Sequence, residues 1–157
     1  MKKDSRLSNV LHVLLHMAQK PEVPLRSEDM AKAMNTNPVV ARRVMAGLRR
    51  KGYVQSEKGH GGGWLLTCDL STTTLKDVYE ALGPPSLLAI GPRSEHPECI
   101  VEASVNSALE VTYRQAQEIL IAGLDAITLA SLTHDVIERI EKRKIQAQKN
   151  TKADNNE

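Results

Sequence analysis

Aromatic residues are scarce in this sequence, and phenylalanine is absent from it altogether. Aromatic residues make up only 3% of the chain, whereas hydrophobic residues of all kinds make up 41%. A core formed by this sequence must therefore consist mainly of leucine, valine, isoleucine, alanine and methionine. Aliphatic residues with few β-branched runs favour packed helices over a β-sandwich, so the composition predicts a mainly α-helical fold.

Cysteine and long hydrophobic runs are rare as well. The only cysteines are Cys68 and Cys99, which excludes a disulfide framework. The first apolar stretch is interrupted by Asn9, His12 and His16, and no run in the sequence approaches the length that spans a bilayer. These features predict a cytoplasmic protein.

Motifs of the common enzyme classes are missing too. The sequence has no phosphate-binding loop after a strand, no nucleophile elbow and no metalloprotease histidine pair, so we expect no enzymatic activity. His12 and His16 are four residues apart and could chelate a metal, but no third ligand is evident. Helix packing with an exposed imidazole is the favoured interpretation of this pair, and we expect no metal site.

The formal net charge of +2 hides a strong asymmetry between the two parts of the chain. Residues 1–60 contain 12 Lys and Arg against 5 Asp and Glu, a net charge of +7, whereas residues 61–157 contain 9 against 14, a net charge of −5. A basic front part favours a polyanionic partner. Nucleic acid is the leading candidate, and an anionic membrane surface is the second.

Hydrophobic periodicity predicts three helices in the first part of the chain. The first, over residues 5–19, has apolar residues at spacings of three and four. The second, over residues 28–34, follows Ser27, which has the residue type of an N-cap. The third begins after Asn37, a capping residue that a proline follows, and ends at Gly52.

Two short strand-like runs come next, at Tyr53–Ser56 and Trp64–Thr67, and a glycine-rich tip connects them as a β-hairpin. We interpret Trp64 as an anchor of this hairpin rather than as a base-stacking residue. Cys68 follows the second strand, and core packing is its favoured role. The fold class that these patterns predict is mainly α with a small β-hairpin.

The rest of the sequence predicts helices separated by a loop. Thr74 and Asp77 form the pattern of a capping box in front of an amphipathic helix. Residues 84–98 contain four of the seven prolines and are predicted to be a loop. A long helical pattern extends from about residue 98 to 122, and Thr128 can cap a last helix.

The order of helix, turn, capped basic helix and glycine-tipped hairpin is typical of a winged helix-turn-helix. Such a fold places one face of its third helix on the domain and the other in the major groove of DNA. The basic residues of that helix and its end are Arg42, Arg43, Arg49, Arg50 and Lys51. Predicted phosphate contacts are Thr36, Asn37 and the amino-terminal amides of the helix, and predicted base-edge contacts are Val39, Arg42 and Arg43.

The glycines of the hairpin tip have a separate role in this interpretation. Without side chains, they let the backbone approach a phosphate or enter the minor groove, where Lys58 and His60 supply charge. Arginines on a helix are by themselves more often a solvated face, and a glycine-rich hairpin tip is by itself more often an ordinary turn. Because both occur here in the order of a winged helix-turn-helix, DNA binding is the favoured interpretation. The predicted DNA-binding residues are Ser27, Thr36, Asn37, Pro38, Val39, Arg42, Arg43, Arg49, Arg50, Lys58, Gly59, His60, Gly61 and Gly62.

These segments together resemble the Rrf-two family of bacterial winged-helix regulators, which includes an iron–sulfur cluster regulator and a nitric-oxide-sensing repressor. The resemblance covers about residues 5–133. It is carried by Arg6-Leu7-Ser8, by residues 44–56, by the Gly-Gly-Gly-Trp wing within 58–66, by Cys99 and by residues 127–132. It implies a homodimer joined by the long helix, with each winged helix on one half of a palindromic site. The dimerisation positions are then Val101, Val105, Ala108, Thr112, Ala116 and Ile119.

The chain departs from the family in its cysteines. Cluster-binding members carry three cysteines before the long helix, whereas only Cys99 matches that region here. His96 and Cys99 cannot hold a cluster unaided, so the sequence resembles the cluster-free subgroup and we expect no cofactor. The family also often places an acidic or uncharged polar residue where Arg42 stands, and an arginine there favours guanine contacts.

Cys99 follows His96 closely and is predicted to lie at a helix start. Helix amides and the nearby imidazole lower the pKa of a thiol, so Cys99 with His96 is a candidate redox sensor. The alternative is a small buried residue that packs the long helix against the winged domain. The predicted division of the chain is a DNA-binding domain at 1–83, a linker or sensor loop at 84–98, dimerisation helices at 99–141 and a disordered tail at 142–157.

The leading functional hypothesis is a homodimeric repressor that binds double-stranded DNA and no membrane. Its signal would be thiol oxidation, a small ligand or a partner protein. A second hypothesis is a winged-helix interaction module that binds a metabolic enzyme, and a third is an iron–sulfur sensor, which the cysteine count disfavours.

Overall fold

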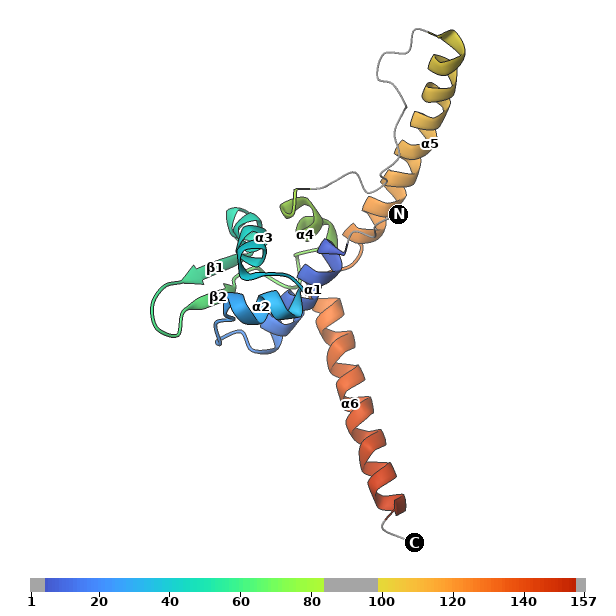
Figure 1. The fold of residues 1–157 in the computed structure, drawn as a ribbon. Coiled ribbons are helices and arrows are strands. Elements are labelled where there is room, and N and C mark those ends of the chain that lie inside the picture. Colours follow the sequence, from blue (N-terminus) through green and yellow to red (C-terminus); the bar gives the residue numbers. More distant parts are fainter. Residues whose placement is uncertain (1–4, 84–98, 155–157) are drawn as a thin grey trace.

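A computed structural model describes residues 5–83 and 99–154 of the protein, with side chains to residue 146 (Figure 1). The elements in chain order are α1 (Arg6–Gln19), α2 (Ser27–Ala33), α3 (Pro38–Arg50), β1 (Val54–Glu57), β2 (Gly63–Leu66), α4 (Leu75–Ala81), α5 (Ile100–Asp125) and α6 (Leu129–Asp154). The first four helices and the hairpin form a winged-helix unit, from which α5 and α6 extend in opposite directions (Figure 1). The predicted mainly α fold with a small hairpin is confirmed.

Two of the predicted helix starts have the expected caps. The side-chain oxygen of Asn37 accepts hydrogen bonds from the N–H groups of Val39 and Val40, each at 3.0 Å. At α4, Thr74 and Asp77 form a reciprocal capping box, with the Thr74 N–H donating to the Asp77 carboxylate at 2.8 Å. Such caps satisfy helix-end donors that would otherwise lack a partner.

The start of α2 differs from the prediction. Arg26 is the residue that precedes the helix in extended conformation, and Ser27 is its first residue without a capping hydrogen bond. The Ser27 hydroxyl instead accepts a hydrogen bond from Nε of Arg42, at 3.3 Å. The predicted N-cap role of Ser27 is therefore wrong, because a side chain of α3 uses its oxygen.

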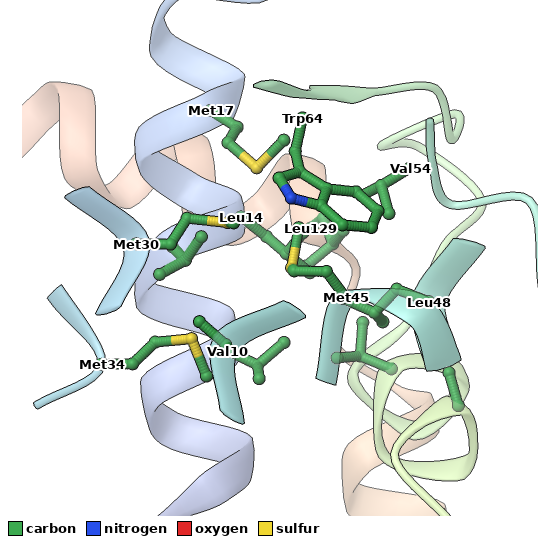
Figure 2. Close-up of a cluster of buried hydrophobic side chains, with 14 of the residues drawn as sticks. Val10, Leu14, Met17, Met30, Met34, Met45, Leu48, Val54, Trp64 and Leu129 are labelled. Carbon is green, nitrogen blue, oxygen red and sulfur yellow. The ribbon is translucent and has the colours of Figure 1, made fainter. Parts of the chain in front are cut away.

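The core of the winged-helix unit is built almost entirely from aliphatic residues and methionine (Figure 2). Helix α1 contributes Val10, Val13, Leu14 and Met17, all of them buried. Trp64 is the one large aromatic residue in this cluster and is only 8% exposed, so its predicted role as a hairpin anchor is confirmed. Fully burying one of the valine, leucine or methionine side chains of this core contributes about 1.5–3 kcal/mol.

The hairpin is held to the rest of the unit at its base. Strands β1 and β2 pair antiparallel, with Val54 opposite Leu66 and Glu57 opposite Gly63. Leu25, which precedes α2, extends this pairing, because its N–H and C=O both bond to Trp64 at 2.9 Å. A Cβ atom at Gly63 would lie 2.7 Å from the Leu25 oxygen, so this close approach requires glycine.

The corner between α5 and α6 belongs to the winged-helix unit. Leu129, the first residue of α6, is fully buried in the core beside Trp64 (Figure 2). The Leu129 N–H donates to the Thr73 oxygen at 2.9 Å, and the Leu75 N–H donates to the Ile127 oxygen at 2.9 Å. The predicted segments 1–83 and 99–141 thus share one hydrophobic core.

Helix α6 continues to Asp154, so the predicted disorder is wrong for residues 142–154. This segment contains neither glycine nor proline and is rich in lysine, glutamine and alanine, which favour helix. Ion pairs one turn apart also support the helix just before it. Nε of Arg139 lies 2.7 Å from Asp135, and Nζ of Lys142 lies 3.1 Å from Glu138.

Helix α5 has no buried residue in this single chain. Ile100 is 84% exposed, Val101 is 70% exposed and Ile119 is 74% exposed. A helix that is apolar on several sides is usually covered by other protein. None of the helices in the described part of the chain is long and apolar enough to cross a membrane.

We predict that Leu129→Ala lowers the free energy of unfolding of the winged-helix unit by about 2–5 kcal/mol, because it leaves a cavity in the core. Urea unfolding followed through Trp64 fluorescence, at one fixed protein concentration, measures this change. Ile145→Ala is the control, because Ile145 lies in the same helix and is 54% exposed. An equally small effect of both substitutions would show that Leu129 does not contribute to that core.

Candidate nucleic-acid interface

The basic side chains of α3 lie on its outward face. Ala41, Met45 and Leu48 are buried against the core, whereas the four arginines of the helix are exposed: Arg42, Arg43, Arg49 and Arg50. Val39, at the start of the helix, is 63% exposed. The helix therefore presents the residues predicted for base contact on the side away from the core.

Arg49 connects α3 with the hairpin. Its Nη1 donates to the hydroxyl of Ser56 on β1 at 3.2 Å, and its guanidinium carbon lies 6.0 Å from the ring centroid of Trp64. That distance allows a cation–π interaction. The structure thus places Arg49 at the junction of α3 and the wing, where it contacts both.

Arg43 and Arg50 lie on the other flank of α3. With Arg6 of α1 and apolar residues of α3 and α4, they line a hollow of about 300 Å³. Arg6 was not among the predicted interface residues. Its proximity could not be read from the sequence, because it depends on how α1 packs beside α3.

The amino-terminal amides of α3 are used within the helix. Asn37 accepts from the N–H groups of Val39 and Val40, Pro38 has no N–H, and the Ala41 N–H bonds to the Asn37 oxygen at 3.0 Å. The predicted binding of phosphate to these amides would therefore have to break the cap.

The wing tip needs glycine for its shape. Gly59 and Gly61 have φ angles of +102° and +86°, which side chains disfavour. A Cβ atom on Gly62 would collide with the backbone oxygen of Glu57. Lys58 and His60 are exposed on this tip, as the prediction requires.

A hollow of about 510 Å³ separates the wing from α2 and α3. Arg26, Glu28, Arg42 and Glu57 line it, together with the wing glycines and Trp64. Nη2 of Arg42 lies 3.5 Å from the carboxylate of Glu28. Hydrophobic periodicity does not link Glu28 to Arg42, because a contact between two helices, 14 residues apart in the chain, leaves no periodic signal.

The two cysteines lie in different environments. Burial raises the pKa of the half-buried Cys68 thiol, and the Thr73 side chain opposes that shift. Cys99 is exposed at the N-cap of α5, where the backbone N–H groups of Glu102 and then Val101 lower the pKa of its thiol. His96 lies outside the described residues, so its pairing with Cys99 stays a prediction.

The donor set does not fit an iron–sulfur cluster. The whole sequence has two cysteines, and they belong to separate elements. A cluster needs several thiolates or substitutes for them. Within residues 5–83 and 99–146, no three histidine, cysteine or acidic side chains gather in a group that could hold a metal. His12 and His16 contact each other, with 2.9 Å between their Nε2 atoms.

Three comparisons place these features among known proteins. The family model Rrf2, described as an iron-dependent transcriptional regulator, matches residues 4–135. YwnA of Bacillus subtilis (strain 168), described as an HTH-type transcriptional regulator, is 30% identical over 114 residues, which are 73% of this chain and 84% of YwnA.

Solved structures show the same fold. A structure described as a transcriptional regulator from Lactobacillus plantarum has a TM-score of 0.71 and 22% identity, and the match covers 94% of this chain and 98% of that one. CymR, the global cysteine regulator of Bacillus subtilis, has a TM-score of 0.60 and 22% identity over 85% of this chain and 97% of its own.

We predict that Cys99 reacts with iodoacetamide faster than Cys68. As the pH is raised, the increase in rate for Cys99 should come at a lower pH than the increase for Cys68. A lowered pKa gives more thiolate below the usual value of 9.0, whereas burial shields Cys68 and raises its pKa. Mass spectrometry of peptides from the native protein, sampled over a pH series, measures both rates. Equal rates for the two thiols would contradict this assignment.

Proposed function

Because the chain belongs to the Rrf2 family of transcription regulators, we propose that it binds a palindromic operator as a homodimer and represses transcription. Family membership makes it a DNA-binding transcription regulator. The dimer, the operator symmetry, the sign of regulation and the contacting residues are the proposed part.

The outward basic face of α3 is the observation that carries this proposal. Its buried residues orient the helix, so that Val39, Arg42 and Arg43 meet base edges in the major groove. Arg50 and Lys58 are exposed cations on either side, and they are suited to the phosphates. The wing tip would follow the minor groove, with Gly59, His60, Gly61 and Gly62 close to the backbone.

The exposed apolar surface of α5 supports the homodimer. This helix of 26 residues carries valine, isoleucine and leucine in contact with solvent in the single chain. A second copy of the chain would cover that surface with the same residues of its own α5, as a twofold interface requires. The proposed dimer residues are Val101, Val105, Ala108, Thr112, Ala116 and Ile119.

The signal acts on this dimer through thiol oxidation, a small ligand or a partner protein. Cys99 supports the first of these, because it is exposed and lies directly at the start of the dimer helix. No step through an iron–sulfur cluster is proposed, because the donors do not fit one. The proposal includes no enzymatic activity and places the protein in the cytoplasm.

We predict different effects of two substitutions on DNA affinity. Arg43→Ala should cost about 1–3 kcal/mol on the operator and relax the preference for one base pair. Lys58→Ala should weaken all duplexes about equally and reduce the slope of log affinity against log salt by about 1. Fluorescence anisotropy over a salt series measures both, with an operator first selected from genomic fragments. If the wild-type protein binds none of the duplexes at low salt, the hypothesis of a protein-interaction module is favoured instead.

We predict that Val105→Glu converts the protein to a monomer, because it places a charge in the proposed interface. Sedimentation velocity measures the mass, and footprinting shows whether one or both half-sites are protected. Glu110→Gln is the control, because Glu110 is exposed on the same helix and is not among the proposed dimer residues. A dimer of unchanged stability with Val105→Glu would refute the proposed interface.

A further inference from the structure

Arg42, the arginine proposed for base contact, is held by two residues of α2. Its Nε donates to the Ser27 hydroxyl at 3.3 Å, and its Nη2 lies 3.5 Å from a carboxylate oxygen of Glu28. Both contacts cross from one helix of the helix-turn-helix to the other. They lie at the edge of the hollow between α3 and the wing.

These two contacts engage Nε and Nη2 of the guanidinium and leave Nη1 without a partner among the described residues. Nε–H and one N–H of Nη2 point to the same side of the planar group; Nε–H donates to Ser27, and the Glu28 carboxylate lies nearest to Nη2. The end of the group, formed by Nη1 and the second N–H of Nη2, carries no hydrogen bond to a described residue. Two parallel donors of that kind match the O6 and N7 atoms of guanine.

The negative charge of Glu28 also changes how strongly Arg42 attracts phosphate. The two side chains are exposed by 61% and 55%, so the pair adds little to stability. A negative charge beside the arginine reduces the attraction of the pair for phosphate, which is the same for every duplex. The donors at the end of the guanidinium remain, so the contact with a matching base is retained.

We propose that Glu28 is a positioning residue, which holds Arg42 for end-on contact with a guanine and suppresses its use as a general phosphate contact. The inference rests on the proposed DNA interface and assigns the source of its selectivity. Specificity is a difference of two affinities, and Glu28 lowers the affinity for the wrong duplex more than for the right one. Ser27 contributes the second point of support.

The test compares wild type with Glu28→Gln on two duplexes of equal length, the selected operator and an unrelated sequence. We expect the substitution to raise affinity for the unrelated duplex and to lower the ratio of the two affinities by about threefold to tenfold. The salt slope on the unrelated duplex should become steeper, because Arg42 then acts on phosphate. Thermal unfolding should not change appreciably.

Asp29→Asn is the matched control. Asp29 is the next acid on α2, and its partner is Lys32 at 4.0 Å rather than an arginine of α3. Removing its charge should raise affinity for both duplexes by the same factor. A second control places Glu28→Gln in an Arg42→Ala protein, where the affinity ratio should no longer respond to it.

The outcomes separate this inference from the proposed function. If Asp29→Asn lowers the ratio as much as Glu28→Gln, or if the effect persists without Arg42, Glu28 acts only as bulk charge and the inference is overturned. An unchanged ratio with Glu28→Gln overturns it as well, while the DNA interface stands. If wild type fails to distinguish the two duplexes, the proposed function itself fails and the role of Glu28 fails with it.

Discussion

Hydrogen bonds between the α5–α6 corner and the approach to α4 hold the two parts of the protein together. Besides the bonds at Leu75 and Leu129, the Ala130 N–H donates to the Leu70 oxygen at 2.8 Å. Lys76 and Thr74 both contact Asp125, the last residue of α5. An antiparallel bridge between Thr74 and Thr128 and the fully buried Leu129 fasten this corner to the winged-helix unit. The corner therefore links the direction of α5 to the placement of the winged-helix unit that contains α3.

The four arginines of α3 do not form a uniform positive stripe, because each has a different neighbour. Arg49 is engaged with the wing through Ser56 and Trp64, whereas Arg42 is engaged with α2. Arg43 and Arg50 line the opposite flank. Two of the four thus serve to join elements as well as to carry charge, and a count of positive residues would overstate how many are available for phosphates.

Local chemistry explains which features could be predicted from the sequence. The caps at Asn37 and Thr74 depend on residues two or three positions apart, and the aliphatic periodicity of α1 and α3 depends on one helix at a time. The role of Ser27, the burial of Leu129 and the Glu28–Arg42 pair depend on contacts between elements far apart in the chain. A single sequence contains no periodic signal for such contacts. High polarity does not by itself indicate disorder after residue 142, because the lysine, glutamine and alanine of that segment favour helix.

The distance along α5 limits how a signal can reach the DNA-binding surface. A helix of 26 residues is about 39 Å long at about 1.5 Å per residue, and Cys99 precedes its far end (Figure 1). In the proposed function, a chemical change at Cys99 would act on α5, the helix whose start it caps. The corner transfers a movement of α5 to α4, which packs against α3 at Gly47, where a Cβ atom would lie 2.6 Å from the Ala81 oxygen. With no space left at that contact, α3 has to follow α4 rather than slide past it.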